Sequence, residues 1–128
     1  MIIGVGIDAV AVERFAAWQN KSIQQLRRIF SDQEIVYCLS VAGKSAERFA
    51  ARFAAREALL KALSSLNSSL SLLQVSRASR VVQGRPPVMQ VDWQKLRIDT
   101  QKLNIHLSLS HTKTDAYAVV ILELIAVV

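Results

Sequence analysis

The segment RFAARFAAREALLKAL, residues 48–63, constrains the fold more than any other part of the chain. Alanine, leucine, arginine and glutamate are strong helix formers, so the segment is typical of a long α-helix. At about 100° per residue, Phe49, Phe53 and Leu60 fall within about 40° of one another on this helix. The alanines at positions 51, 55, 58 and 62 gather on roughly the opposite side. A helix that is apolar on two sides is usually buried on both, so we expect a central helix or a subunit interface.

The ends of this helix and its neighbours follow from capping patterns and turn residues. Ser45 is the predicted N-cap of the long helix, with Glu47 in its first turn, and Ser31 with Glu34 forms a predicted capping box for an earlier helix. Other predicted helices span residues 12–19, 22–30 and, after Asp92, 93–102, and predicted strands span residues 2–10, 75–82, 87–92, 105–110 and 116–125.

The order of these elements is strand, helices, strand pair, helix, strand pair. Residues 83–86 form a predicted turn within the first pair, and residues 111–115 form a hairpin-sized loop within the second. We therefore expect an α+β fold, in which the long central helix packs on an antiparallel sheet. The length of 128 residues is typical of one domain, and neither side of the serine-rich segment 64–74 resembles an independent unit.

Composition narrows the classes of partner and compartment. The net charge of +6 favours anionic partners, which include nucleic acid, phosphates and acidic proteins. Aromatic residues make up only 6% of the chain and show no basic–aromatic pattern for stacking bases, so a nucleic-acid-binding domain rests on charge alone and is disfavoured. The single cysteine, Cys38, suits a reducing compartment such as the cytoplasm. Glu123 interrupts the longest apolar run, so no membrane span is expected.

Glu57 and Lys61 lie one turn apart on the long helix. A glutamate four residues before a lysine is the favoured orientation for a helix-stabilising ion pair, worth about 0.2–0.5 kcal/mol. Considered on the helix alone, this ordinary pair is the better interpretation.

Asp8 favours a different interpretation. It lies in IIGVGIDAV, an apolar strand whose neighbours call for burial. Buried acids are almost always paired or bound to a metal, so Asp8 either meets an arginine or converges with Glu57 as an oxygen ligand. Two carboxylates and several waters suit Mg²⁺, which leaves positions for substrate phosphates. Lys61, Arg52 and Lys44 are then candidates to receive the phosphate charge.

His111 follows a predicted strand and is flanked by two hydroxyl residues, Ser110 and Thr112. A histidine in this position is more often structural than catalytic, so His111 gains weight only from the other candidate residues. His106, in the alternating segment IHLSLS, is interpreted as an ordinary strand residue.

Five segments, in order, resemble the holo-acyl-carrier-protein synthases, the small group of 4′-phosphopantetheinyl transferases. GIDAVAVERF resembles the N-terminal motif of that family, with Asp8 at its acid, and FSDQEIVYC resembles the helix after its Phe-Ser/Thr pair. RFAARFAAREALLKAL resembles the signature helix, with Glu57 and Lys61 in place. GRP at 84–86 resembles the Gly-Lys-Pro turn, and LSLSHTKTDAYAVVILE resembles the Ser-His-Thr hairpin.

The resemblance implies an enzyme that moves the phosphopantetheine arm of coenzyme A onto a serine of apo acyl carrier protein. It implies Mg²⁺ held by Asp8 and Glu57, with Asp8, Glu57, Lys61 and His111 as catalytic residues. The base that takes the serine proton is either Glu57 or a metal-bound water. The family forms homotrimers with active sites between subunits, works in fatty acid biosynthesis, and has a strongly acidic protein partner. The residues implied at the coenzyme A site are Lys44, Arg52, Lys61, Pro86, Ser110, His111 and Thr112, and the candidates for carrier-protein docking are Arg14, Arg27 and Arg28.

The chain departs from the family pattern at two places. Arg56 stands where the family usually has a lysine, and Ser64-Ser65-Leu66 stands where it commonly has Gly-Thr-Gly. Serine lacks the conformational freedom of glycine, so the loop after Leu63 is expected to differ in shape. The alternative function is therefore a degenerate relative that binds coenzyme A or carrier protein without transfer.

Overall fold

The structure is a computed structural model that describes residues 1–99 and 103–125. The elements follow the predicted order of strand, helices, strand pair, short helix and strand pair, which is an α+β arrangement. In chain order the elements are β1 (Ile2–Ala11), the 3₁₀ helices η1 (Val12–Phe15) and η2 (Trp18–Asn20), α1 (Ile23–Leu26), α2 (Asp32–Leu39), α3 (Ser45–Leu63), α4 (Leu72–Ala78), β2 (Ser79–Val82), β3 (Val88–Val91), η3 (Trp93–Leu96), β4 (Leu103–His111) and β5 (Asp115–Leu124).

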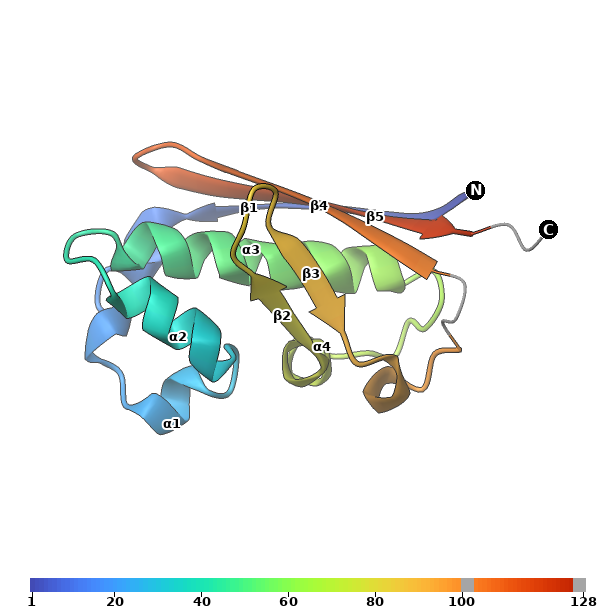
Figure 1. The fold of residues 1–128 in the computed structure, drawn as a ribbon, viewed down its shortest axis with the longest axis horizontal. Coiled ribbons are helices and arrows are strands. Elements are labelled where there is room, and N and C mark those ends of the chain that lie inside the picture. Colours follow the sequence, from blue (N-terminus) through green and yellow to red (C-terminus); the bar gives the residue numbers. More distant parts are fainter. Residues whose placement is uncertain (100–102, 126–128) are drawn as a thin grey trace.

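The long helix α3 lies between two layers (Figure 1). On one side is a three-stranded antiparallel sheet with the order β1-β5-β4. On the other side lie α1, α2 and α4, and the β2–β3 hairpin forms a separate sheet beside the helix. The prediction of a central helix on an antiparallel sheet is confirmed. The two apolar sides of α3 are both covered within one chain, so they do not require a subunit interface.

The alanine side of α3 touches the backbone of β1. A Cβ atom at Gly6 would overlap the Ala58 carbonyl oxygen, and one at Gly4 would overlap that of Ala62. Only glycine on the strand and alanine on the helix permit this approach. Because β1 and α3 are in direct contact here, Asp8 on the strand is held beside the last turns of the helix.

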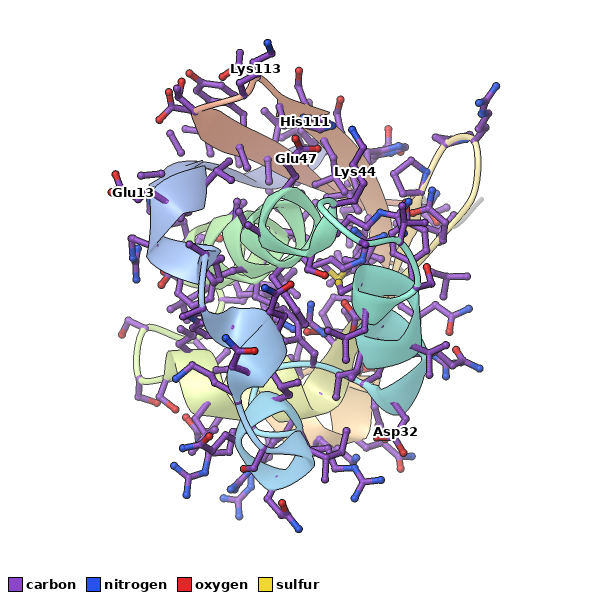
Figure 2. The ribbon with its side chains drawn as sticks, turned by 90° about the vertical axis from the view of Figure 1, so that its left-hand side faces the viewer. Glu13, Asp32, Lys44, Glu47, His111 and Lys113 are labelled. Atoms are coloured by element: carbon purple, nitrogen blue, oxygen red, sulfur yellow. The ribbon has the colours of Figure 1, made fainter. Side chains whose placement is uncertain are left out.

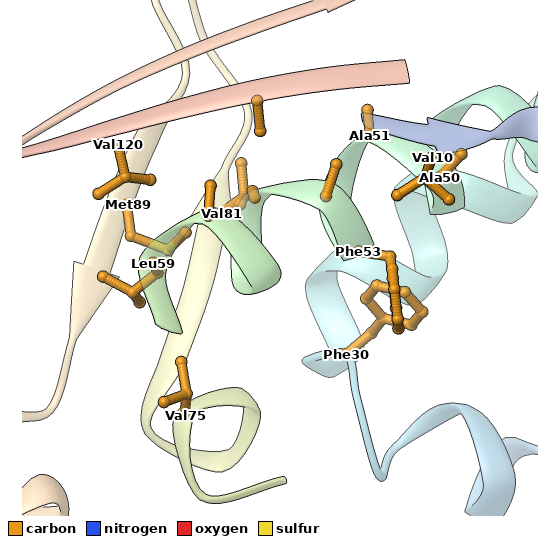
Figure 3. Packing of buried hydrophobic residues seen from close by; sticks show 14 of the residues in the cluster. Val10, Phe30, Ala50, Ala51, Phe53, Leu59, Val75, Val81, Met89 and Val120 are labelled. Atoms are coloured by element: carbon orange, nitrogen blue, oxygen red, sulfur yellow. The ribbon is translucent and has the colours of Figure 1, made fainter. Parts of the chain in front are cut away.

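The phenylalanine side of α3 packs in an aromatic cluster. The Phe53 ring lies 5.3 Å from that of Phe15, and the Phe49 ring lies 5.1 Å from that of Phe30. Trp18 contacts all four rings. Figure 3 shows Phe30 and Phe53 in this part of the core, with Leu59, Val75 and Val120 packed farther along the helix.

A buried ion pair ties α3 to its polar neighbours. Arg56 Nη1 donates to Glu34 Oε2 at 2.7 Å, and Nη2 donates to Glu34 Oε1 and, at 3.1 Å, to the Ser79 carbonyl oxygen. Neither side chain is more than 1% exposed. Burial raises the pKa of Glu34, but the hydrogen bonds and charge of Arg56 outweigh it and hold that pKa below its ordinary value. The predicted Ser31–Glu34 capping box is confirmed, so Glu34 serves both the start of α2 and this pair.

Several predicted boundaries are wrong. Ser45 is the first helical residue of α3, and Lys44 occupies the N-cap without a side-chain hydrogen bond, although Glu47 does lie in the first turn. The predicted strand 75–82 is a strand only from Ser79, because a Ser71–Gln74 capping box begins a helix at Leu72. This box lies inside the serine-rich segment that was interpreted as a loop.

The shorter helices are also less regular than predicted. Residues 12–19 form two 3₁₀ turns, and 22–30 contain one α-helical turn, Ile23–Leu26. The helix expected over 93–102 is a 3₁₀ turn that ends where Arg97 takes a left-handed conformation with φ of 54°. Residues 100–102 of that prediction, and the end of the apolar tail at 126–128, lie outside the described residues.

The outer side of β1 is apolar and exposed, which the burial expected for this strand did not anticipate. Val5 and Ile7 are 59% and 62% exposed, and Tyr117 on β5 is 40% exposed. Only the inner face of the sheet is covered by α3, so alternate residues of β1 face outward. No helix in the described part of the chain has the length and apolarity needed to cross a bilayer.

Candidate active site

Asp8, Glu57 and Lys61 form a polar cluster where β1 meets the last turns of α3. Lys61 Nζ donates to Asp8 Oδ1 at 3.1 Å and to the Ile7 carbonyl oxygen at 2.9 Å. The Asp8 side chain is only 15% exposed. Among the described residues, Lys61 pairs with Asp8 and not with Glu57, so the ordinary helix pair is not what forms.

The electrostatic environment of Glu57 disfavours its ionised carboxylate form. Partial burial and the negative charge of Asp8 raise the pKa of Glu57, and the positive charges of Lys61 and Arg14 only partly offset them. Two neighbouring carboxylates repel each other, and a cation bound between them would lower this repulsive energy. The pair therefore has the electrostatic character of a cation site.

The donor set of this cluster fits a hard divalent cation. In the part of the chain that the structure describes, no group of three or more Asp, Glu, His or Cys residues converges. A site with two carboxylates leaves most of an octahedral shell to waters and substrate oxygens, as Mg²⁺ prefers. The residues present thus fit Mg²⁺ and fit poorly a metal that needs an all-protein cage.

The second candidate site is a hollow of about 340 Å³ at the opposite end of α3. It lies between the start of α3, the end of β4 and the tip of the β2–β3 hairpin. Figure 2 shows Lys44, Glu47 and His111 gathered there. The polar residues that line this hollow, called here the basic hollow, are Tyr37, Lys44, Glu47, Arg48, Arg52, Gln83 and His111.

Arg52 is the most firmly held cation of the basic hollow. It is 3% exposed, and its Nη2 donates to Gln83 Oε1 at 2.6 Å. The Tyr37 ring lies 4.3 Å from its guanidinium carbon, and Arg48 lies 4.1 Å from the same ring. The buried Arg52 Nε has no hydrogen-bond partner among the described residues. This guanidinium is thus oriented in advance and carries an unused donor.

Glu47 lies near two other residues of the basic hollow, Lys44 and His111. Its Oε2 lies 3.8 Å from His111 Nδ1 and 4.0 Å from Lys44 Nζ. Both distances exceed those of hydrogen bonds, so the Glu47–Lys44 contact is electrostatic, and the Glu47–His111 contact is ionic only when the imidazole is protonated. Both partners are more than half exposed and remain accessible to an anionic ligand.

The remaining coenzyme A candidates take different positions. Pro86 is exposed at the hairpin tip, and its neighbour Pro87 lines the hollow. Ser110 alternates with Leu109 and faces the outer side of the sheet. The Thr112 hydroxyl accepts hydrogen bonds from the Thr114 and Asp115 amides, so it holds the hairpin that carries His111.

Tyr37, Glu47 and Gln83 were not identified as site residues from the sequence. Glu47 was interpreted as a first-turn acid, and Gln83 as part of a turn. Gln83 directly precedes the Gly-Arg-Pro turn, which was a usable signal. Their shared position depends on how α2, α3 and the hairpin meet, which the sequence pattern does not give.

The three candidates for carrier-protein docking do not lie together in the structure. The Arg14 guanidinium lies 5.2 Å from the Phe53 ring centre, and its charge lowers the pKa of Glu57, so it borders the carboxylate cluster. Arg27 instead pairs with Asp32, with Nε 2.8 Å from Oδ1. Arg28 is exposed beside it.

The serine loop after α3 closes without glycine. Ser64 Oγ donates to the Lys61 carbonyl oxygen at 2.6 Å, and Ser65 Oγ donates to that of Ile3 at 2.9 Å. Among described non-glycine residues, only Arg97 has a positive φ. The serines therefore satisfy the end of α3 and fasten it to β1, and the backbone does not need the left-handed region there.

The carboxylate cluster and the basic hollow lie on opposite sides of α3. Arg52 and Lys61 are nine residues apart, which corresponds to about 180° around the helix and about 13 Å along it. The chain therefore presents two separate candidate sites.

Comparison with known proteins places this arrangement in a family. Residues 4–121 match the family model described as the 4′-phosphopantetheinyl transferase superfamily. A holo-[acyl-carrier-protein] synthase of Treponema denticola is 40% identical over 125 residues, which cover 96% of this chain and 99% of the relative.

Solved structures agree. An ACPS–CoA complex from Chronobacterium ammoniagenes aligns with a TM-score of 0.76 at 26% identity, covering 94% of this chain and 96% of its own. An acyl carrier protein synthase of Mycobacterium tuberculosis aligns with a TM-score of 0.69 at 32% identity, covering 97% and 99%. The protein belongs to the 4′-phosphopantetheinyl transferase superfamily and, within it, to the holo-[acyl-carrier-protein] synthases.

Proposed function

We propose that the protein transfers the 4′-phosphopantetheine arm of coenzyme A to a serine of apo acyl carrier protein, with Mg²⁺. The serine oxygen bonds to the phosphorus that carries pantetheine, and the bond from that phosphorus to adenosine 3′,5′-bisphosphate breaks. The carboxylate pair of Asp8 and Glu57 carries this proposal, since phosphoryl-type transfer depends on neutralising charge and on positioning.

The carboxylate cluster supplies the groups that act on the reacting phosphates. Asp8 and Glu57 would hold Mg²⁺, which supplies Lewis-acid polarisation of phosphate oxygens. Lys61, fixed against Asp8, is positioned to steady the departing bisphosphate. The serine proton goes to Glu57 or to a water beside it.

The basic hollow would bind the adenosine end of coenzyme A. Arg52 has an oriented guanidinium with a free Nε, and Lys44 and His111 are exposed beside it. His111 acts here by binding and orienting phosphate. Thr112 would act by holding the hairpin, and Ser110 and Pro86 would contact the ligand from the rim.

A homotrimer with shared active sites would explain why the carboxylate cluster and the basic hollow lie apart, because each would then be one half of a site. In such an assembly, the carboxylate cluster of one subunit faces the basic hollow of its neighbour. The exposed apolar side chains of Val5 and Ile7 on β1 and Tyr117 on β5 supply a surface to bury between subunits. We expect sedimentation to give a trimer, and an Ile7→Lys variant to dissociate. A monomeric wild-type protein with full activity would contradict the shared site.

The acidic carrier protein would dock near Arg14, Arg27 and Arg28. Arg14 is the strongest candidate, because it borders the carboxylate cluster where the serine must arrive. The net charge of +6 supports association with an acidic partner. Arg27 and Arg28 extend the positive surface along the chain.

We further propose that residues 1–128 act as one cytoplasmic domain in fatty acid biosynthesis. One continuous core links β1, α3 and β5. Burial raises the pKa of Cys38 to about 12, so its thiol stays protonated, in keeping with a reducing compartment.

Intact mass spectrometry tests the activity. Apo acyl carrier protein, coenzyme A and Mg²⁺ are incubated with the wild type, with Glu57→Gln, and with Glu13→Gln as a matched exposed-acid control. We expect a mass gain of one phosphopantetheine arm with the wild type and the control, and none with Glu57→Gln. Binding of coenzyme A without any mass gain would favour the degenerate relative instead.

A further inference from the structure

A second and larger hollow lies on the side of α3 away from the three-stranded sheet. Its volume is about 810 Å³, and it is bordered by the end of α1, the start of α2, α4, the β2–β3 hairpin and η3. Figure 2 shows Asp32, one of its lining residues, at the opposite end of the molecule from Lys44, Glu47 and His111. The proposed coenzyme A site does not include this hollow, which we call the α4 hollow.

Cations predominate in the walls of the α4 hollow. Four of its lining residues are basic (Arg27, Arg77, Arg80 and Lys95), and two are acidic (Asp32 and Asp92). Arg27 follows α1, and the other three cations lie on α4, β2 and η3, so the fold brings them together and no single basic run does.

Two of these cations are free to bind a ligand. Arg27 already pairs with Asp32 at 2.8 Å, and Arg80 Nε donates to Gln90 Oε1 at 2.8 Å. Within residues 1–99 and 103–125, neither Arg77 nor Lys95 forms an ion pair with a carboxylate. Both are exposed at the wall of the hollow.

Ser76 gives an independent indication of a ligand. This residue lines the α4 hollow and is 5% exposed, yet its buried Oγ has no hydrogen-bond partner among the described residues. A buried hydroxyl without a hydrogen-bond partner is energetically unfavourable. Serines in helices commonly bond the carbonyl four residues back, as Ser79 at the end of α4 does with Val75 at 2.6 Å. Ser76 leaves its donor unused beside two free cations.

We propose that the α4 hollow binds a small phosphate-bearing anion, separately from coenzyme A. A volume of about 810 Å³ accommodates a ligand of metabolite size. Arg77 and Lys95 would bind the phosphate oxygens, and Ser76 would donate the inner hydrogen bond. Ser31 and Asp32 place the N-terminus of the eight-residue helix α2 at the rim, where its dipole also favours an anion. The negative charges of Asp32 and Asp92 repel an anion. A ligand that pairs with Arg27 in place of Asp32 therefore gains the most affinity.

NMR titration with inorganic pyrophosphate tests this site on the whole ¹⁵N-labelled chain. Coenzyme A is present in excess to fill the basic hollow, so the titration does not depend on transfer activity. We expect pyrophosphate to shift the amides of residues 76–80 and 91–95. A second titration with inorganic phosphate tells whether one phosphate suffices, and one with adenosine 5′-monophosphate tells whether a nucleotide binds better.

Variants that remove positive or negative charges should change the affinity for pyrophosphate in opposite directions. Arg77→Gln with Lys95→Gln should weaken pyrophosphate binding at least about tenfold, because charged hydrogen bonds are lost. Asp32→Asn should tighten it, since it removes a repulsive charge and frees Arg27. Lys44→Gln, at the other hollow, should leave it unchanged.

Two results would overturn the proposal. One is the absence of any shift at residues 76–80 and 91–95 when the spectrum shows a folded protein. The other is binding that weakens equally in Lys44→Gln and in the Arg77–Lys95 variant, which would indicate nonspecific attraction to the basic surface. Neither result bears on whether the carboxylate cluster catalyses transfer, which the mass measurement decides separately.

Discussion

Glu57 shows how one residue can be read differently at successive levels of structure. On the helix it forms an ordinary pattern with Lys61. In the folded chain, Lys61 turns to Asp8, and Glu57 is left near a second carboxylate. The cost of that arrangement has a measurable consequence for stability.

Replacing Glu57 with glutamine should stabilise the protein at neutral pH without divalent cations. The folded-state pKa of Glu57 is raised, so its stabilising contribution is present below the unfolded value and lost as pH rises through the folded value. Thermal unfolding at pH 7 should therefore give a higher Tm for Glu57→Gln than for the wild type, and the gap should close below about pH 4. Mg²⁺ should raise the Tm of the wild type more than that of the variant. Equal Tm values throughout, with Glu13→Gln as control, would refute the proposed strain.

Arg56 is the second residue where identity matters. Removing either partner of its buried pair with Glu34 leaves an unpaired buried charge, which costs about 3–5 kcal/mol. We expect Arg56→Leu and Glu34→Gln each to lower the free energy of unfolding by about that amount. The double variant should lose much less than the sum, because no unpaired charge remains. Urea denaturation measures all three, and additive losses would mean that the two side chains act independently.

At the scale of elements, the contact between β1 and α3 determines the positions of the residues in the carboxylate cluster. Glycines on the strand meet alanines on the helix, and this close approach brings Asp8 to Lys61 and Glu57. The serine loop strengthens the contact, since Ser65 bonds back to β1. The glycines of IIGVG therefore matter for the geometry of the active site as well as for stability.

Gly6→Ala should separate this pair of elements. The new Cβ would overlap the Ala58 carbonyl oxygen, so strand and helix must move apart, with a loss of about 1–3 kcal/mol or more. Gly84→Ala is the matched control, because its Cβ would meet only the Pro86 carbonyl oxygen at 3.2 Å in an exposed turn. Unfolding should be easier for the first variant alone. Mg²⁺ should also raise the Tm of Gly6→Ala by less than it raises the Tm of the wild type. An equal rise in both would show that the contact does not position the carboxylates.

At the scale of the whole molecule, the carboxylate cluster and the basic hollow lie on opposite sides of α3. The proposed homotrimer rests on the exposed apolar residues of β1 and on the separation between the carboxylate cluster and the basic hollow. Neither feature is visible from any single element.

Mixing two inactive variants tests shared sites. Glu57→Gln disables the carboxylate cluster and His111→Ala weakens the basic hollow, so each homo-oligomer should be poorly active. After subunit exchange, mixed oligomers contain some sites with both halves intact, and activity should rise above that of either variant. Native mass spectrometry verifies the exchange. Mixed oligomers without recovered activity would place the complete site within one chain.

Local patterns in the sequence were enough for the α+β class, the long helix and the Ser31 capping box. They also selected Asp8, Glu57 and Lys61, which lie together in the structure, whereas His111 lies apart from them beside Glu47. They were misleading where tertiary contacts decide. The strand predicted to begin at residue 75 starts as helix because Ser71 and Gln74 cap it, and the outer face of β1 stays exposed because a single helix covers the sheet.

What the sequence by itself determined is periodicity and chemistry: two apolar sides on α3, glycines on β1, and the residue types of a family site. Only the tertiary structure decided which charges meet. Lys61 bonds Asp8 and not Glu57, Arg56 is buried against Glu34, and Arg52 is held by Gln83 from a distant hairpin. The physical reason is that helix and strand periods are set by neighbours along the chain. Ion pairs and hollows depend on distances between segments far apart in sequence, and packing alone fixes those distances.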